Sequence, residues 1–144
     1  MYKPLIKTTG WSAILLGLLV FVFYYFYYPY HLLYQEQFQL FLNTSDYLSQ
    51  QTARPGGLSE YIAGYFIQFF CYRWYGALTM AVLLGLMTYL VTVIGFKFGR
   101  KKAFECLACI PAILYWALLC DESYLLGGVV AVILTMLPMP LYQR

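Results

Sequence analysis

The stretch "GALTMAVLLGLMTYLVTVIGF", residues 76–96, decides the fold, because it is a long apolar run without a charged residue. A helix needs about 20 largely apolar residues to cross the hydrocarbon core of a bilayer. This stretch meets that requirement by itself. It therefore predicts a transmembrane helix, and the rest of the chain is interpreted around it.

Three further apolar runs accompany this helix, and with it they predict four transmembrane spans at about 11–28, 76–96, 103–120 and 124–141. The fourth run reaches spanning length only if it continues past Pro138. The composition agrees, since 62% of the residues are hydrophobic and 10% are charged. A soluble domain is nearer half apolar and a quarter charged. We expect an all-α membrane protein with a single membrane domain over residues 1–144.

The basic residues predict the orientation of these spans. With both termini in the cytoplasm, seven of the nine basic residues lie on the cytoplasmic side, and only Arg54 and Arg73 lie outside. This distribution follows the positive-inside rule. The segment 29–75 is therefore expected on the external face. The net charge of +3 is too small to indicate a nucleic-acid partner.

The external segment 29–75 has the periodicity of two amphipathic helices. Polar and apolar residues recur at spacings of three and four over Tyr34–Gln50 and again over Leu58–Tyr72. The residues "NTSD" at 43–46 favour caps and turns and are a candidate break in the first helix. The predicted helices lie near the membrane plane. The side chains expected to face lipid or bundle are those of Phe38, Phe41, Leu58, Ile62 and Phe69, and those expected on the opposite face are Glu60, Gly64 and Gln68.

Between these helices, "TARPGGLSEY" at 52–61 is the most polar and turn-rich passage of the chain. Free N–H groups at a helix start favour an anion, and glycine lets an oxygen approach the backbone. We therefore consider Arg54, Gly56 and Gly57 a candidate site for an anionic headgroup or lipid phosphate. The alternative is a tight turn between two interfacial helices, with Glu60 offsetting the positive charge.

The residues "EQFQLFLNTSDYLSQQTARPGGLSEYIAGYFIQFF" at 36–70, followed by "YGAL" at 75–78, resemble the N-terminal part of a Bacteroidota family of polytopic inner-membrane proteins of unknown function. That resemblance implies the bacterial inner (cytoplasmic) membrane. The arrangement of spans is also similar to the opening of GT-C type glycosyltransferases, which use lipid-linked sugars. That second resemblance implies a base or metal ligand in the first external loop, for which Glu36 and Asp46 are the matching candidates.

Two functions are expected from these features. The first is an N-terminal module related to lipid-linked glycosyl transfer at the external face. The second is a non-enzymatic membrane subunit that binds the bilayer, a membrane-protein partner or a second copy through its external helices and through small-residue rows such as Ala77, Ala81 and Gly85. A reading frame that continues with further spans would favour the first.

The remaining reactive residues predict little chemistry. No metal site and no cofactor are expected. Cys106 and Cys109 are expected to be packing residues, and His31 is expected at the membrane interface. A disulfide between Cys71 and Cys120 is left open.

Overall fold

The computed structural model describes residues 3–38, 41–97 and 104–142, and all regular secondary structure in this part of the chain is helical. The elements, in chain order, are α1 (Lys3–Val22), the π-helical turn η1 (Phe23–Tyr27), α2 (Pro29–Phe38), α3 (Ser45–Thr52), α4 (Gly57–Ile67), α5 (Arg73–Lys97), α6 (Phe104–Leu119), α7 (Gly127–Met136) and α8 (Pro138–Tyr142). The prediction of an all-α fold is confirmed.

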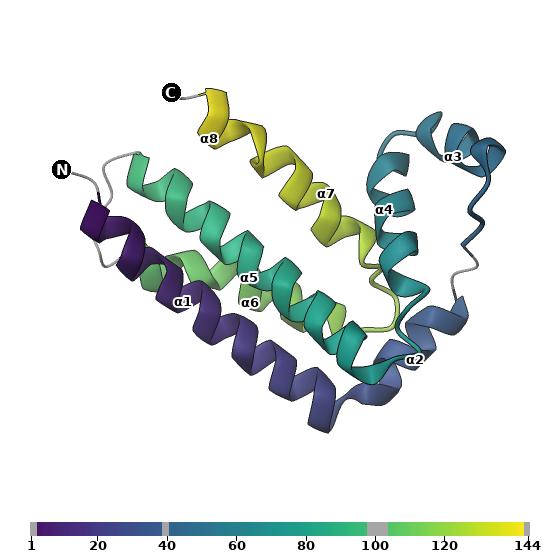
Figure 1. The fold of residues 1–144 in the computed structure, drawn as a ribbon, viewed down its shortest axis with the longest axis horizontal. Coiled ribbons are helices and arrows are strands. Elements are labelled where there is room, and N and C mark those ends of the chain that lie inside the picture. The colour runs from purple at the N-terminus through teal and green to yellow at the C-terminus, as the bar shows by residue number, and fades with distance from the viewer. Residues whose placement is uncertain (1–2, 39–40, 98–103, 143–144) are drawn as a thin grey trace.

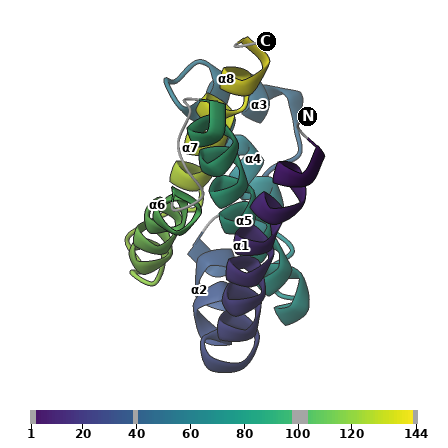
Figure 2. The ribbon, with the colours of Figure 1, turned by 90° about the vertical axis from the view of Figure 1, so that its left-hand side faces the viewer.

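The four predicted apolar helices form a bundle around α5, which contacts α1, α6 and α7 (Figures 1 and 2). The start of α1 and the end of α8 lie at one end of the bundle, and α2 lies at the other (Figure 1). The helix α4 packs against α7, and α3 packs against α4 (Figure 1). We call α2, α3 and α4 together the cap.

Two of the helices are long and apolar enough to cross a membrane, over Gly10–Tyr27 and Arg73–Phe96. The other two apolar helices, Cys106–Leu119 and Gly127–Pro140, are shorter. The predicted fourth helix starts later than residue 124 because the chain turns first, where the Asp121 carboxylate accepts the Ser123 N–H at 2.8 Å. A break separates α7 from α8 at Leu137, where Pro138 has no N–H to continue the helix.

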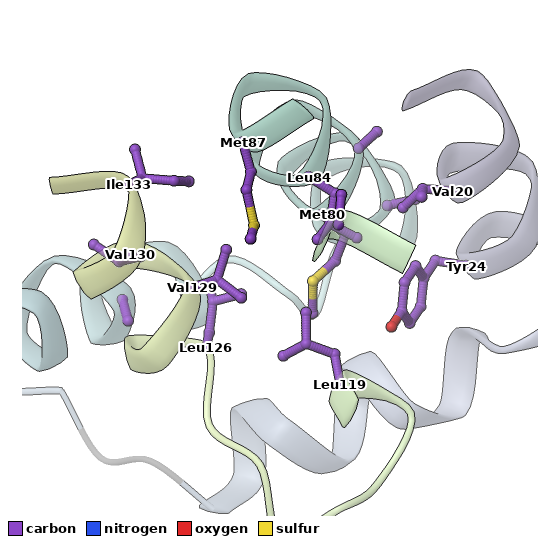
Figure 3. Packing of buried hydrophobic residues seen from close by; sticks show 14 of the residues in the cluster. Val20, Tyr24, Met80, Leu84, Met87, Leu119, Leu126, Val129, Val130 and Ile133 are labelled. Atoms are coloured by element: carbon purple, nitrogen blue, oxygen red, sulfur yellow. The ribbon is translucent and has the colours of Figure 1, made fainter. Parts of the chain in front are cut away.

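Small residues bring α1 and α5 together. A Cβ at Gly17 would lie 3.2 Å from the Ala81 carbonyl oxygen, and a Cβ at Gly85 would lie 3.3 Å from the Ala13 carbonyl oxygen. The predicted row of small residues on α5 therefore packs against α1 inside the bundle. Side chains of α5 then fill the space between α1 and α7, as Figure 3 shows for Met80, between Tyr24 on one side and Val129 on the other.

The first predicted external helix is broken, which corrects the prediction of one helix over Tyr34–Gln50. The chain is non-helical from 41 to 44, and Thr44 is extended and accepts the Tyr47 N–H on its Oγ1 at 3.3 Å. Thr44 thereby caps the start of α3. Phe41 lies in this non-helical stretch and packs against Gly64. A Cβ at Gly64 would be 3.1 Å from the Phe41 ring.

The second predicted external helix ends at Ile67 rather than Tyr72, and its buried face differs from the predicted one. Turns follow it, with the Phe70 N–H donating to the Ile67 carbonyl at 2.9 Å. The buried residues of α4 are Gly57, Ser59, Ala63, Gly64 and Ile67. Gly64, which was expected on the polar face, is buried, whereas Leu58, which was expected to face lipid or bundle, is 52% exposed. Contact with α7 explains this, because α4 presents its small side chains to that helix.

Candidate functional site

A group of polar side chains is buried where η1, α2 and the end of α6 meet. His31 and Gln35 lie one turn apart on α2, on the same face as the buried Leu32. Their side chains are 4% and 3% exposed, and Gln35 Nε2 lies 3.1 Å from His31 Nε2. The fully buried Tyr24 is next to them, with its ring centroid 6.4 Å from that of His31. We call Tyr24, His31, Gln35 and their neighbour Trp116 the polar cluster.

The hydrogen bonds of His31 define its protonation state. An amide nitrogen only donates, so the ring nitrogen Nε2 that faces Gln35 Nε2 accepts and carries no proton. The ring also hydrogen-bonds to the backbone of Leu119. Burial lowers the pKa of His31, and the Leu119 backbone and the carboxylates of Glu122 and Asp121 oppose that effect. The histidine is therefore a neutral link between α2 and the end of α6, and its expected position at the membrane interface stays a prediction.

The π-helical turn places Tyr24 in this cluster. The Tyr28 N–H donates to the Phe23 carbonyl five residues earlier, at 3.0 Å. The ring of Phe23 contacts Tyr24 edge-on at 5.3 Å and Trp116 edge-on at 5.2 Å. The ring of Tyr28 stacks on His31 at 5.2 Å. The cluster is thus enclosed by aromatic rings from both sides of the π turn.

The turn that contains Arg54, Gly56 and Gly57 connects α3 to α4. Gly56 has a φ of +83°, which favours glycine, and a Cβ at Gly57 would overlap the backbone carbonyl of Gln51. The Gly57 N–H donates to the Arg54 carbonyl at 3.0 Å, and the N–H groups of Ser59 and Glu60 donate to the Gly56 carbonyl at 3.1 and 3.2 Å.

Arg54 itself is exposed. The turn folds α3 back onto α4, and these hydrogen bonds occupy three of the amides that an anion would use. Anion binding by Arg54, Gly56 and Gly57 stays a prediction.

The two candidate catalytic carboxylates lie on different helices with different packing partners. Glu36 is half-buried on α2, which packs against α5, whereas Asp46 is exposed in the first turn of α3, which packs against α4. The Asp46 backbone carbonyl accepts the Ser49 hydroxyl at 2.9 Å. Their catalytic role also stays a prediction.

The structure has a cavity between α4 and α7 and a groove along α1 and α5. A cavity of about 180 Å³ lies between α4 and α7, beside Ser59, Glu60 and the paired Gly127 and Gly128. An open apolar groove of about 730 Å³ follows the outer side of the α1–α5 contact, over Gly10, Gly17 and Gly85.

Within the part of the chain that the structure describes, no disulfide joins Cys71 to Cys120, and the two residues carry separate thiols. Over the described ranges, no group of three or more His, Cys, Asp and Glu residues is arranged to hold a metal ion.

Sequence reasoning missed Tyr24, Gln35 and Trp116. The available signal was the four-residue spacing of His31 and Gln35 around the apolar Leu32, which places both polar groups on the side of α2 that turns inward.

The chain belongs to the family of unknown function DUF6057, which it matches over residues 5–144. No curated protein and no solved structure matches it.

Proposed function

We propose that this member of the DUF6057 family is an integral membrane protein whose four apolar helices cross a bacterial inner membrane and hold the cap on the external face. One observation carries the proposal, which is that large apolar side chains are exposed on the outside of the bundle while small ones are buried at the contact between α1 and α5. Small side chains such as Ala77 and Ala81 are buried, whereas Trp11 is 70% and Leu18 is 62% exposed on the outer side of α1. Helices pack this way when lipid surrounds them, because burying large apolar side chains then brings no advantage.

The charged residues support this placement. The sequence has no charge within 10–27, 74–96, 106–120 or 124–142, so the long apolar stretches of the chain carry no charged residue. The end at which α1 begins and α5 ends is basic in sequence, while five of the six acidic residues belong to the opposite end or the cap. The positive-inside rule then favours cytoplasmic termini.

Exposed aromatic residues support the level of the external boundary. They surround the end of the bundle that adjoins the cap, where Tyr27, Tyr30, Tyr72 and Trp74 are 78%, 79%, 61% and 57% exposed. Tyrosine and tryptophan are enriched at membrane–water interfaces because one part of the ring system is apolar and another is polar.

Labelling of single cysteines tests this topology. The four native cysteines are first replaced by serine, and Gln50→Cys and Lys101→Cys are then introduced separately. An impermeant maleimide added to intact cells should label position 50 and label position 101 only after the cells are opened. Labelling of position 101 alone in intact cells would reverse the topology. Release of the protein by alkaline carbonate would contradict membrane insertion altogether.

For the role of this module, we favour binding at the membrane surface over catalysis. The cap and the stretch before α3 expose large apolar side chains, namely Leu42, Leu48, Leu58 and Tyr65, at 49%, 38%, 52% and 46%. We infer that these exposed side chains rest on the lipid headgroups, as those of interfacial helices do.

A depth measurement tests this inference. With the native tryptophans replaced by phenylalanine, Leu58→Trp should be quenched by brominated lipid, and the exposed Gln50→Trp should be quenched much less. Equal, weak quenching at both positions would leave these side chains free for a protein partner or a second copy of the chain.

Lipid-linked glycosyl transfer is the alternative function, with Glu36 and Asp46 as base or metal ligand and Arg54 on the phosphate of the substrate. The position of Glu36 favours it, since this half-buried carboxylate follows directly after the buried Gln35. Loss of a glycan product in Glu36→Gln and Asp46→Asn cells, with normal protein levels, would support catalysis. An unchanged glycan profile in both variants would argue against catalysis by these carboxylates and would favour the binding role.

A further inference from the structure

His31 makes two hydrogen bonds that respond differently to a proton. Its ring nitrogen Nε2 accepts from the Gln35 amide at 3.1 Å, and the ring also bonds to the backbone of Leu119 at the end of α6. A protonated imidazole donates from both nitrogens and accepts no hydrogen bond. Protonation therefore leaves the bond to Leu119 possible but turns the contact with Gln35 into one between two donors.

The surroundings of the ring disfavour a positive charge. The side chain is 4% exposed, the Tyr28 ring stacks on it at 5.2 Å, and the Tyr24 ring lies 6.4 Å away between centroids. Burial is the largest influence on His31 and lowers its pKa. A charge that stays unpaired in such surroundings costs free energy. A protonated ring is therefore better placed elsewhere.

Two carboxylates offer the charged ring such a place. Those of Glu122 and Asp121 act on His31 and favour its protonated form, against the effect of burial. Both residues are exposed and belong to the turn that follows α6, where the Asp121 carboxylate accepts the Ser123 N–H at 2.8 Å. Further titratable groups on α2 and around it include Tyr34, Glu36, Tyr24, Tyr28, Glu60, Arg73 and Cys120. Glu60 and Arg73 are exposed, and Cys120 hydrogen-bonds to Tyr24.

We propose that a protonated His31 ring leaves Gln35 and turns out of the polar cluster to pair with the carboxylates of the turn that follows α6. The neutral ring has its best partner inside, which is the Gln35 amide. The charged ring has its best partners outside. Because the ring joins α2 to the end of α6, its departure loosens the contact between the cap and the bundle in acid.

This exchange of partners makes the cap a pH-sensitive device. Under the proposed topology the cap faces the external compartment, so it responds to acid on that side of the membrane. That consequence rests on the proposed orientation, whereas the exchange itself does not.

Titration of the ring tests the outer partners. His31 is the one histidine of the chain, so its ring signals in magnetic resonance spectra need no assignment. The pH midpoint of the ring should fall in the double variant Asp121→Asn, Glu122→Gln, because the charged ring loses its partners. Asparagine keeps an oxygen for the Ser123 N–H. Glu60→Gln is the control, since it removes the same charge from an exposed position on α4. A double variant that moves the midpoint no more than the control would contradict the pairing.

The sign of a second shift tests the inner partner. Gln35→Met keeps an unbranched side chain but removes the amide that donates to the neutral ring. Only the neutral ring uses that donor, so the midpoint should rise. A lower midpoint would mean that the Gln35 amide turns its oxygen to the charged ring and holds it inside, which would overturn the exchange.

Exposure of the ring tests the movement itself and needs no variant. A soluble paramagnetic agent should leave the His31 signals intact above the pH midpoint and weaken them below it. A ring that takes up its proton and stays shielded would overturn the proposal. Both measurements are made in detergent, where the orientation of the helices plays no part. Their failure is therefore distinguishable from failure of the cysteine-labelling experiment.

Discussion

The bundle and the cap pack by different means, and the difference reflects the surroundings of each. In the bundle, α1 and α5 meet through backbone and small side chains, as at Gly17 against the Ala81 carbonyl. In the cap, aromatic rings make the contacts, with Phe41 at 5.1 Å from Tyr61 and Tyr47 at 6.1 Å from Tyr61. Burying a large apolar group stabilises a protein that is surrounded by water, but it brings no hydrophobic stabilisation when the surroundings are lipid. The comparison indicates that α1 and α5 are joined by close approach of their backbones, whereas α3 and α4 are joined by contacts between half-buried rings.

The largest effect is expected from filling the α1–α5 contact. Gly17→Leu places a side chain against the Ala81 backbone carbonyl, which cannot yield as a flexible side chain does. We expect a loss of about 3 kcal/mol, the upper part of the range for overpacking. Gly10→Leu is the control, because a Cβ there meets nothing within 4 Å. Thermal unfolding in detergent measures both, and equal midpoints would show that close approach does not hold the bundle together.

A smaller effect is expected at the turn of the cap. Gly57→Ala makes Cβ overlap the Gln51 carbonyl and should cost about 2 kcal/mol, comparable with other overpacking. Gly56→Ala strains only the backbone, because Gly56 has a positive φ and open space around it, and should cost about 1 kcal/mol. Proteolysis of α3 should follow the same order. The reverse order would mean that α3 is not held against α4 through Gly57.

Loss of the cap residue of α3 should have a more local effect. Thr44→Ala removes the hydroxyl that accepts the Tyr47 N–H, at an expected cost of about 1 kcal/mol to α3. Hydrogen exchange of the α3 amides should accelerate about fivefold, with no change in α5. Ser45→Ala, one residue later, is the control. Equally fast exchange in both variants would mean that the Thr44 hydroxyl does not account for the effect.

The smallest effect is expected from pH. Because the folded pKa of His31 is lowered, the folded state binds a proton less readily than the unfolded chain does. The stabilising contribution of neutral His31 is fully present above its ordinary pKa of about 6.5 and decreases as the pH falls through and below that value. The cap should loosen over this range while the bundle remains unchanged.

His31→Gln should remove this dependence, as measured by exchange of the α2 amides between pH 7.5 and 5. Asp121 should not interfere, because its hydrogen bonds with Ser123 lower its pKa. A pH dependence that persists in His31→Gln would assign the proton to another group.

The same contrast explains how far the sequence predicts the fold. A long run without charge, such as residues 76–96, predicts a helix from composition alone, and α5 confirms it. The cap depends on particular contacts instead. Periodicity predicts one helix over Tyr34–Gln50. In the structure, Phe41 is non-helical and packs against Gly64, and Thr44 caps the start of a new helix, α3. The burial of His31 also depends on a tertiary contact, with Leu119, which is distant in sequence.

The π turn at Phe23–Tyr27 makes the position of the cap sensitive to the length of the chain. In a π-helical turn the hydrogen bond joins residues five apart, whereas in an α-helical turn it joins residues four apart, so the π turn contains one additional residue. Deletion of one residue there would restore ordinary helical winding and rotate α2 relative to α1 by about 100°. The face of α2 that carries His31 and Gln35 would then point elsewhere. A substitution by a residue of similar size leaves that angle unchanged. Insertions and deletions at this site should therefore displace the cap, whereas such point mutations should not.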